Sequence, residues 1–182
     1  MATVALPSSP DVSAPFRVAP IGREHLIGFH EALDRIAREG RYLAMLQAPP
    51  YARTRRFVLE SLRDGAIHFV ALAGDETVVG WCDLRPKAAA TLRHSAVLGM
   101  GVIEQWRGRG IGSTLLAATL ASADARGLRR AELVVRADNH AAIALYRRFG
   151  FAEEGRCRQY LRLDDQDHDA LLMARLVSEQ PR

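Results

Sequence analysis

The stretch from residue 95 to residue 149 constrains the fold of this chain more than any other part of it. It begins with an apolar segment, SAVLGMGVI, runs through a glycine-rich segment, EQWRGRGIG, and continues into an apolar helical segment, STLLAATLASADARG. A second apolar segment, AELVV, follows, and a short helical segment ends in ALYRRFGF. This pattern predicts a strand, a glycine-rich turn, a helix and a second strand in succession. Backbone N–H groups are free in the first turn of a helix, which also carries the positive end of the helix dipole, so we expect this turn to hold a pyrophosphate.

Hydrophobic spacing and turn residues predict the element order β α α β β β α β α β β for the whole chain. We expect one mixed α/β domain over residues 16–182, because no repeat or linker divides the sequence. Residues 1–15, rich in proline, serine and small side chains, are expected to form a flexible leader. The expected strands cover 16–19, 67–73, 77–84, 94–103, 130–135, 151–163 and 169–177, and the expected helices cover 23–39, 52–63, 110–126 and 139–149.

The positive charge of the chain lies around the glycine-rich turn. The formal net charge is +4, and eight arginines face four acidic residues between positions 104 and 148, so the remainder of the chain is balanced. No interleaved aromatic residues and no recognition-helix pattern accompany these arginines. The charge therefore favours a small polyanionic ligand over nucleic acid.

Other features indicate a cytoplasmic protein without a membrane or metal partner. No apolar run approaches the ~20 residues that span a bilayer, and MATVALPSSPDVSAP lacks the basic and apolar regions of a secretory signal. Cys82 and Cys157 do not have the spacing of metal ligands and form no disulfide framework. We interpret both as free core thiols in a reducing compartment.

The turn RGRGIG, at residues 107–112, differs from two common phosphate-binding loops. A Walker A loop requires a lysine after its second glycine, and the only lysine of the chain is Lys87. The dinucleotide fingerprint is G-x-G-x-x-G, whereas these glycines are spaced G-x-G-x-G. The remaining pattern, R-x-x-G-x-G, consists of Arg107, Gly110 and Gly112, and its glycines let successive N–H groups approach phosphate oxygens. Glycines kept only for a tight strand-to-helix turn are the alternative interpretation.

With these motifs the sequence resembles the GNAT (Gcn5-related) N-acetyltransferase superfamily over roughly residues 16–176. The similarity is most specific in VIEQWRGRGIG, in NHAAIALY at residues 139–146 and in YRRFGF at residues 146–151. The resemblance implies the GNAT fold, a central mixed sheet of six to seven strands flanked by about four helices, with two strands splayed around the coenzyme A site. Gly99 and Gly101 in the first of these strands are consistent with a β-bulge.

The resemblance also implies acetyl-CoA as the cosubstrate, with its pyrophosphate at the turn and its pantetheine arm along the preceding strand. Asn139 matches a family asparagine that contacts pantetheine, although it also suits the N-cap of the following helix. Tyr146 matches a tyrosine that protonates the departing CoA thiolate, and packing beside Phe149 and Phe151 is its alternative role. The two arginines after Tyr146 either remain solvated or reach the adenosine phosphates. The predicted cofactor-binding residues are Met100, Val102, Ile103, Arg107, Gly108, Arg109, Gly110, Ile111, Gly112, Ser113, Asn139, Ala142 and Tyr146.

Acetyl transfer from a thioester to an amine requires a neutral amine, a stabilised oxyanion and a protonated leaving thiolate. An alkyl amine has a pKa near 10.4, so a base, or a water relay to one, has to remove a proton. His94 is the first candidate base because imidazole has a suitable pKa, and Asp83 and Glu31 are two others. Backbone N–H groups near Val102 are expected to polarise the carbonyl, and no covalent enzyme intermediate is required.

The resemblance implies direct transfer in a ternary complex to a primary amine. The acceptor is a small molecule, an amino-acid-like compound or a peptide N-terminus, and FAEEGRCRQY is similar to GNAT branches that acetylate polyamines or ribosomal-protein N-termini. A catalytically silent acyl-CoA-binding regulator and an acyltransferase for longer acyl-CoA are the alternatives. A homodimer is left open.

Overall fold

The computed structural model describes residues 15–177, so the predicted leader, residues 1–15, lies outside the described residues except for its last one. The described chain is a mixed α/β structure with the element order that the sequence predicted. Its strands are β1 (Phe16–Pro20), β2 (Ile67–Ala73), β3 (Val78–Pro86), β4 (Ser95–Val102), β5 (Arg130–Arg136), β6 (Ala152–Leu163) and β7 (Gln166–Leu176). Its α-helices are α1 (Leu26–Arg38), α2 (Tyr51–Arg63), α3 (Ile111–Ala125) and α4 (His140–Arg148).

Two element boundaries differ from the prediction by three residues. A short 3-10 helix, Arg23–His25, precedes α1 and takes up the start of the predicted helix. β7 begins at Gln166, because Asp164 and Asp165 alone form the turn after β6. Both aspartates have positive φ, 47° and 59°, as the two central residues of a type I′ hairpin turn require.

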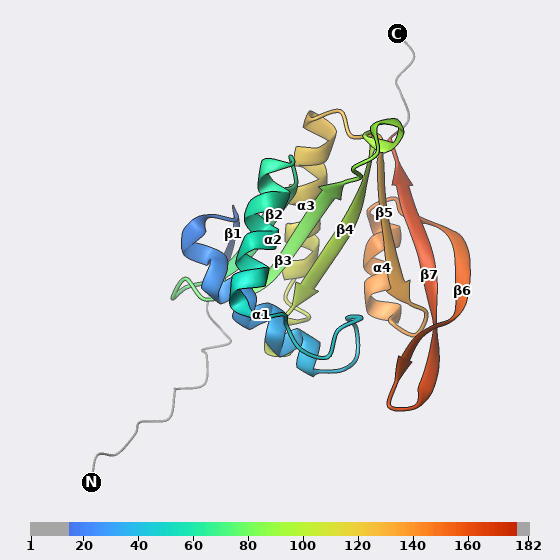
Figure 1. Ribbon diagram of the computed structural model, residues 1–182, viewed down its shortest axis with the longest axis horizontal. Coiled ribbons are helices and arrows are strands. Elements are labelled where there is room, and N and C mark those ends of the chain that lie inside the picture. Colours follow the sequence, from blue (N-terminus) through green and yellow to red (C-terminus); the bar gives the residue numbers. More distant parts are fainter. Residues whose placement is uncertain (1–14, 178–182) are drawn as a thin grey trace.

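One mixed sheet contains the seven strands in the order β1-β2-β3-β4-β5-β7-β6. α1 and α2 cover one face of the sheet, and α3 and α4 cover the other (Figure 1). The alternation of side chains between the two faces of the sheet agrees with this arrangement of helices. A Cβ on Gly101 would contact Ile36 of α1, and a Cβ on Gly80 would contact Leu115 of α3. Within the described residues, no helix is long and apolar enough to cross a membrane.

The sheet opens between β4 and β5, as the prediction of splayed strands required. These two strands are parallel and pair only over Ser95–Arg130, Ala96–Ala131 and Val97–Glu132. Each keeps its other neighbour over a longer stretch, since β3 pairs with β4 up to Val102 and β7 pairs with β5 up to Arg136. The outer pairings therefore hold both strands in place while a gap widens between them.

The predicted β-bulge in β4 is wrong. The register between β3 and β4 is unbroken from Pro86–Ala96 to Gly80–Val102. The two glycines instead allow close approach from the α1 face of the sheet. A Cβ on Gly101 would lie 2.6 Å from the Trp81 ring, and a Cβ on Gly99 would lie 2.9 Å from Oδ1 of Asp83.

Candidate active site

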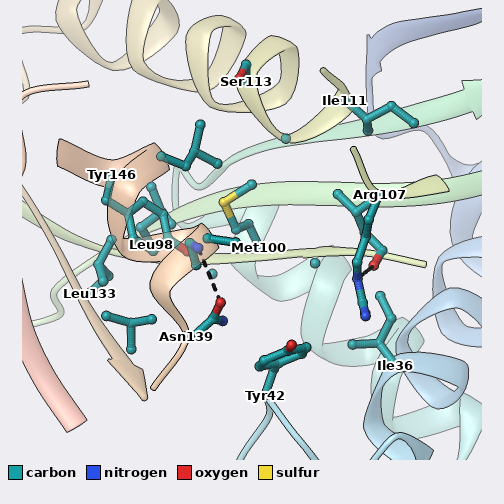
Figure 2. Close-up of a pocket in the computed structure, with 18 of the residues that line it drawn as sticks. Ile36, Tyr42, Leu98, Met100, Arg107, Ile111, Ser113, Leu133, Asn139 and Tyr146 are labelled. Carbon is teal, nitrogen blue, oxygen red and sulfur yellow. Dashed lines mark hydrogen bonds between the residues drawn. The ribbon is translucent and has the colours of Figure 1, made fainter. Parts of the chain in front are cut away.

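A cavity of about 690 Å³ fills the gap between β4 and β5 (Figure 2). One end lies at the glycine-rich turn and the start of α3, where Ser113 lines it, and the other lies against α1 and the loop after it, at Ile36 and Tyr42. Met100 of β4 and Tyr146 of α4 lie between these ends in Figure 2. The sheet opening thus connects a helix N-terminus on one face with the α1 loop on the other.

The glycine-rich turn leaves backbone N–H groups open to the cavity. Gly108 and Gly110 have positive φ, 77° and 84°, and a Cβ on either would meet no atom within 4 Å. Gly110 is the N-cap residue of α3, and no side chain caps this helix end. Free N–H donors and the helix dipole together favour an anion at this position.

Arg148 adds positive charge at the same end. Its guanidinium donates to the Ser113 hydroxyl at 3.3 Å, and both residues line the cavity. Arg147 faces elsewhere and lies 3.7 Å from the Glu153 carboxylate. Of the two arginines that follow Tyr146, Arg148 is therefore the one placed at the cavity.

Arg107, the first residue of the motif, has its guanidinium bound to the protein itself. Nε donates to the Val102 carbonyl at 2.9 Å, and a terminal nitrogen donates to both carboxylate oxygens of Glu39 at 2.7 and 2.6 Å. The guanidinium carbon also lies 5.2 Å from the centre of the Tyr42 ring. Arg107 therefore joins the end of β4 to the C-terminus of α1 and to the loop that lines the cavity.

Asn139 is placed for both of the roles that the sequence analysis left open, as a helix N-cap and as a residue of the cavity wall. Its side-chain oxygen accepts from the Ala142 N–H at 3.2 Å, so it is the N-cap of α4, and it also lines the cavity. An N-cap uses only the oxygen of the side chain, so the amide NH₂ of Asn139 is still available as a donor.

Tyr146 combines packing with access to the cavity. It is buried, its ring centre lies 5.7 Å from that of Phe151, and it lines the cavity. Burial, and to a lesser extent the nearby Cys82, raises the pKa of the Tyr146 phenol above its usual value. The hydroxyl group is therefore protonated throughout the neutral range and is a hydrogen-bond donor.

Two predicted cofactor-binding residues do not line the cavity. Ile103 is buried in the core, and its N–H donates to the Val79 carbonyl at 2.9 Å. Arg109 has its guanidinium carbon 5.1 Å from the centre of the Trp106 ring. The other predicted residues, Met100, Val102, Arg107, Gly108, Gly110, Ile111, Gly112, Ser113, Asn139, Ala142 and Tyr146, line the cavity together.

The cavity also has lining residues that the sequence analysis missed. Most are apolar, and they come from four places: the end of α1 with the loop after it, β4, the short 3-10 helix Glu104–Trp106 after β4, and β5 with α4. The segment YLAML at residues 42–46 was the available signal, because apolar side chains in a loop need a surface to contact. The missed residues include Ile36, Tyr42, Leu43, Ala44, Leu98, Trp106, Leu133, Val134, Val135, Ala141 and Leu145.

None of the three candidate bases lines the cavity. His94 is exposed and precedes β4 at its paired end, about 13 Å along the strand from Leu98 at ~3.3 Å per residue. Glu31 is exposed on α1, and Asp83 is buried on β3. No aspartate, glutamate, histidine or lysine is among the lining residues. The prediction of His94 as the base therefore lacks the proximity that proton transfer needs.

In the described part of the chain, neither cysteine lies at the cavity, and no metal-binding group of side chains is found. Burial raises the pKa of the Cys82 thiol to about 12, so this residue is a thiol rather than a nucleophilic thiolate at neutral pH. Neither Cys82 nor Cys157 lines the cavity. Among residues 15–177, no group of histidine, cysteine, aspartate or glutamate is arranged to hold a metal ion.

Comparison with known proteins agrees with this geometry. Residues 29–151 match the model of the acetyltransferase (GNAT) family. The chain is 26% identical over 123 residues to a putative ribosomal protein bS18 alanine N-acetyltransferase of Bacillus subtilis, covering 68% of this chain and 78% of the relative. It is 32% identical over 151 residues to an N-alpha-acetyltransferase of Sulfurisphaera tokodaii, covering 78% and 86%.

A solved structure extends the comparison to the fold. The phosphinothricin acetyltransferase of Sinorhizobium meliloti, in complex with acetyl-CoA, superimposes with a TM-score of 0.85 at 20% identity, covering 92% of this chain and 93% of that one. The fold and the relatives define the class of this protein as N-acetyltransferases. The chain belongs to the GNAT family.

Proposed function

We propose that this chain moves an acetyl group from acetyl-CoA to a primary amine by direct transfer in a ternary complex. The observation that carries the proposal is the single cavity that joins an uncapped helix N-terminus, Tyr146 and the α1 loop through the gap in the sheet. The pyrophosphate belongs at the N–H groups around Gly110, next to Arg148. The pantetheine arm follows β4, whose backbone beyond Val97 has no strand partner on the β5 side.

The catalytic groups follow from this placement. Backbone N–H groups on the open edge of β4 polarise the thioester carbonyl. Tyr146 donates its phenolic proton to the thiolate that leaves the tetrahedral intermediate. Asn139 holds the pantetheine amides with its free NH₂ group while its oxygen caps α4. Because no cysteine reaches the cavity, the amine attacks the thioester directly.

The acceptor lies at the α1 side of the cavity, between Tyr42 and β5. A polyamine carries further ammonium groups, which need carboxylate partners when they leave water. Since the lining residues include no carboxylate, this cavity favours an acceptor whose only cation is the reacting amine. A peptide N-terminus or an amino-acid-like amine with an apolar side chain meets this condition. We place the reaction in the cytoplasm.

Purified protein is to be mixed with acetyl-CoA and a panel of amines, and free thiol release followed. The panel contains apolar amino acids, short peptides with apolar N-terminal residues, and spermidine. We expect thiol release with the first two classes and much less with spermidine. Thiol release with propionyl-CoA and butyryl-CoA, measured in parallel, shows which acyl chain length the protein prefers. Tight acetyl-CoA binding with no release on any amine would favour the silent binding domain instead.

The contact between Glu39 and Arg107 supplies a prediction within this function. We expect Glu39→Gln to raise the KM of the acceptor about fivefold, because loss of a partly buried charged pair costs about 1 kcal/mol and loosens the loop at Tyr42. The dissociation constant of acetyl-CoA, measured by calorimetry, is expected to change less than about twofold on the same grounds.

The control is Glu76→Gln, which removes the exposed partner of Arg17 at the far edge of the sheet and should change neither constant. A several-fold gain in acetyl-CoA affinity in Glu39→Gln would contradict the prediction. It would mean that the released Arg107 guanidinium turns to the phosphates.

A further inference from the structure

The reaction requires a base, and the cavity wall has none. An ammonium group near pKa 10.4 has to lose a proton before its nitrogen attacks a carbonyl. The ionisable side chains in the wall are those of Arg107, Arg148, Tyr42 and Tyr146, so the wall contains no carboxylate, imidazole or lysine amine. The group that accepts the proton therefore lies behind the wall, at a point where the wall is thin.

Gly99 is such a point. It lines the cavity on β4 and pairs directly with Asp83 on β3. A Cβ on Gly99 would lie 2.9 Å from Oδ1 of Asp83 and 3.6 Å from Oδ2. Any other residue at this position would place its side chain between the carboxylate and the gap. The glycine thus leaves a window through which Oδ1 faces the acceptor side of the cavity, the face covered by α1.

The other oxygen of this carboxylate is already engaged. Oδ2 of Asp83 accepts a hydrogen bond from Nε of Arg85 at 2.9 Å. This contact fixes the orientation of the carboxylate and directs Oδ1 toward Gly99. The arrangement is that of an oriented base, in which one oxygen is held and the other is turned to the proton donor.

We infer that Asp83 is the general base of the acetyl transfer and that it takes the proton of the acceptor ammonium through one water molecule at Gly99. This inference rests on the proposed function. One proton passes from the ammonium to Asp83, and the nitrogen lone pair forms the C–N bond to the thioester carbon. As the carbonyl reforms, the C–S bond breaks and the sulfur takes the proton of Tyr146. The second proton of the nitrogen then returns to the tyrosinate by way of solvent.

The electrostatic surroundings suit this role. Burial raises the pKa of Asp83 to about 6, and the charge and hydrogen bond of Arg85, with a smaller contribution from a hydrogen bond of the Trp81 side chain, limit the rise. The carboxylate is therefore ionised at neutral pH and still a better base than an exposed aspartate. His68, opposite Asp83 on β2, is neutral because burial lowers its pKa to about 3. The buried side chains of α1 and α2 on this face carry no charge.

The first test is Asp83→Asn. With the acceptor that wild type uses, we expect kcat/KM to fall about 100-fold. The dissociation constant of acetyl-CoA is expected to stay within about twofold, because the change lies outside the cofactor end. The rise of wild-type kcat/KM with pH, with an apparent pKa of about 6 in the free enzyme, is expected to disappear in the variant. The matched control is Asp124→Asn. Asp124 lies at the C-terminal end of α3, and its carboxylate pairs with Arg175 of β7, so this variant also removes an arginine-paired carboxylate. It should leave activity and the pH profile unchanged.

Thermal unfolding separates this role from a structural one. A buried carboxylate whose folded pKa is about 6 rather than 3.8 makes the fold less stable as pH rises through this interval. Asp83→Asn removes that dependence, so at pH 8 the variant is expected to unfold at the wild-type temperature or above. A residue kept only for stability would give a lower temperature.

Gly99→Ala is the second variant, because its methyl group would close the window and displace Oδ1. We expect a loss of kcat with acetyl-CoA binding retained. Wild-type activity and pH profile in Asp83→Asn would overturn the assignment of the base while leaving the proposed function intact. Absence of turnover by wild type on every amine would instead contradict the proposed function.

Discussion

Tyr146→Phe is expected to lower kcat at least about 100-fold, the size of effect that loss of one positioned proton donor produces. The phenylalanine ring fills the same buried space and keeps the contact with Phe151, so the cavity wall is unchanged. Only the hydroxyl group is lost, and with it the proposed proton donor for the leaving thiolate. Because burial raises the pKa of this phenol, we expect wild-type kcat to show no decline from ionisation of Tyr146 between neutral and moderately alkaline pH.

Steady-state rates with acetyl-CoA and a calorimetric dissociation constant measure this effect. The dissociation constant is expected to change little, since the hydroxyl group is proposed to act on the transition state rather than on bound cofactor. Tyr160→Phe is the matched control, because Tyr160 is an exposed tyrosine on β6 outside the cavity. An unchanged kcat in Tyr146→Phe would leave packing as the whole role of this residue.

Local pattern was sufficient to predict most of the fold. The helix at residues 110–126 and the strands beside it are separated by glycines at both helix ends, so their order could be read from spacing alone. Gly127 has the positive φ that the residue after a helix C-terminus favours, and Gly110 has a positive φ in the turn before the helix, which glycine adopts without strain. The β-bulge prediction was wrong because a glycine in a strand marks either a bulge or a close approach of other atoms. The positions of the Trp81 ring and the Asp83 carboxylate show that close approach applies here.

The cavity was harder to predict than the elements, because its walls come from distant segments. Arg107 and Glu39 are 68 residues apart, and nothing in either segment indicates that they form a pair. The same limit applies to the base. His94 had the more suitable side chain, but it precedes the paired half of β4, whereas Asp83 faces the open half through Gly99. Strand register places Asp83, and not His94, opposite a residue that lines the cavity, and register depends on the whole sheet.

Gly110→Asp is expected to weaken acetyl-CoA binding at least about 100-fold. Two like charges about 4 Å apart repel by ~4 kcal/mol at an intermediate effective dielectric constant, and each 1.4 kcal/mol is a tenfold change in affinity. The aspartate would also cover the N–H groups of α3 that we propose bind the pyrophosphate. The positive φ of Gly110 strains aspartate less than most other residues, and a negative charge is favourable at a helix N-terminus, so the chain is expected to fold with only a modest loss of stability.

Two further substitutions isolate the charge effect in calorimetric measurements of the acetyl-CoA dissociation constant. Gly110→Asn has the same shape without the charge and should lose about tenfold or less, by the same conversion. Gly127→Asp places the same residue at positive φ, 71°, at the other end of α3, and should bind acetyl-CoA like wild type. Equal losses in the two Gly110 variants would assign the effect to backbone conformation rather than charge. Wild-type affinity in both would mean that the pyrophosphate does not bind at this turn, because Gly110 lines the cavity and a Cβ there would meet no protein atom within 4 Å.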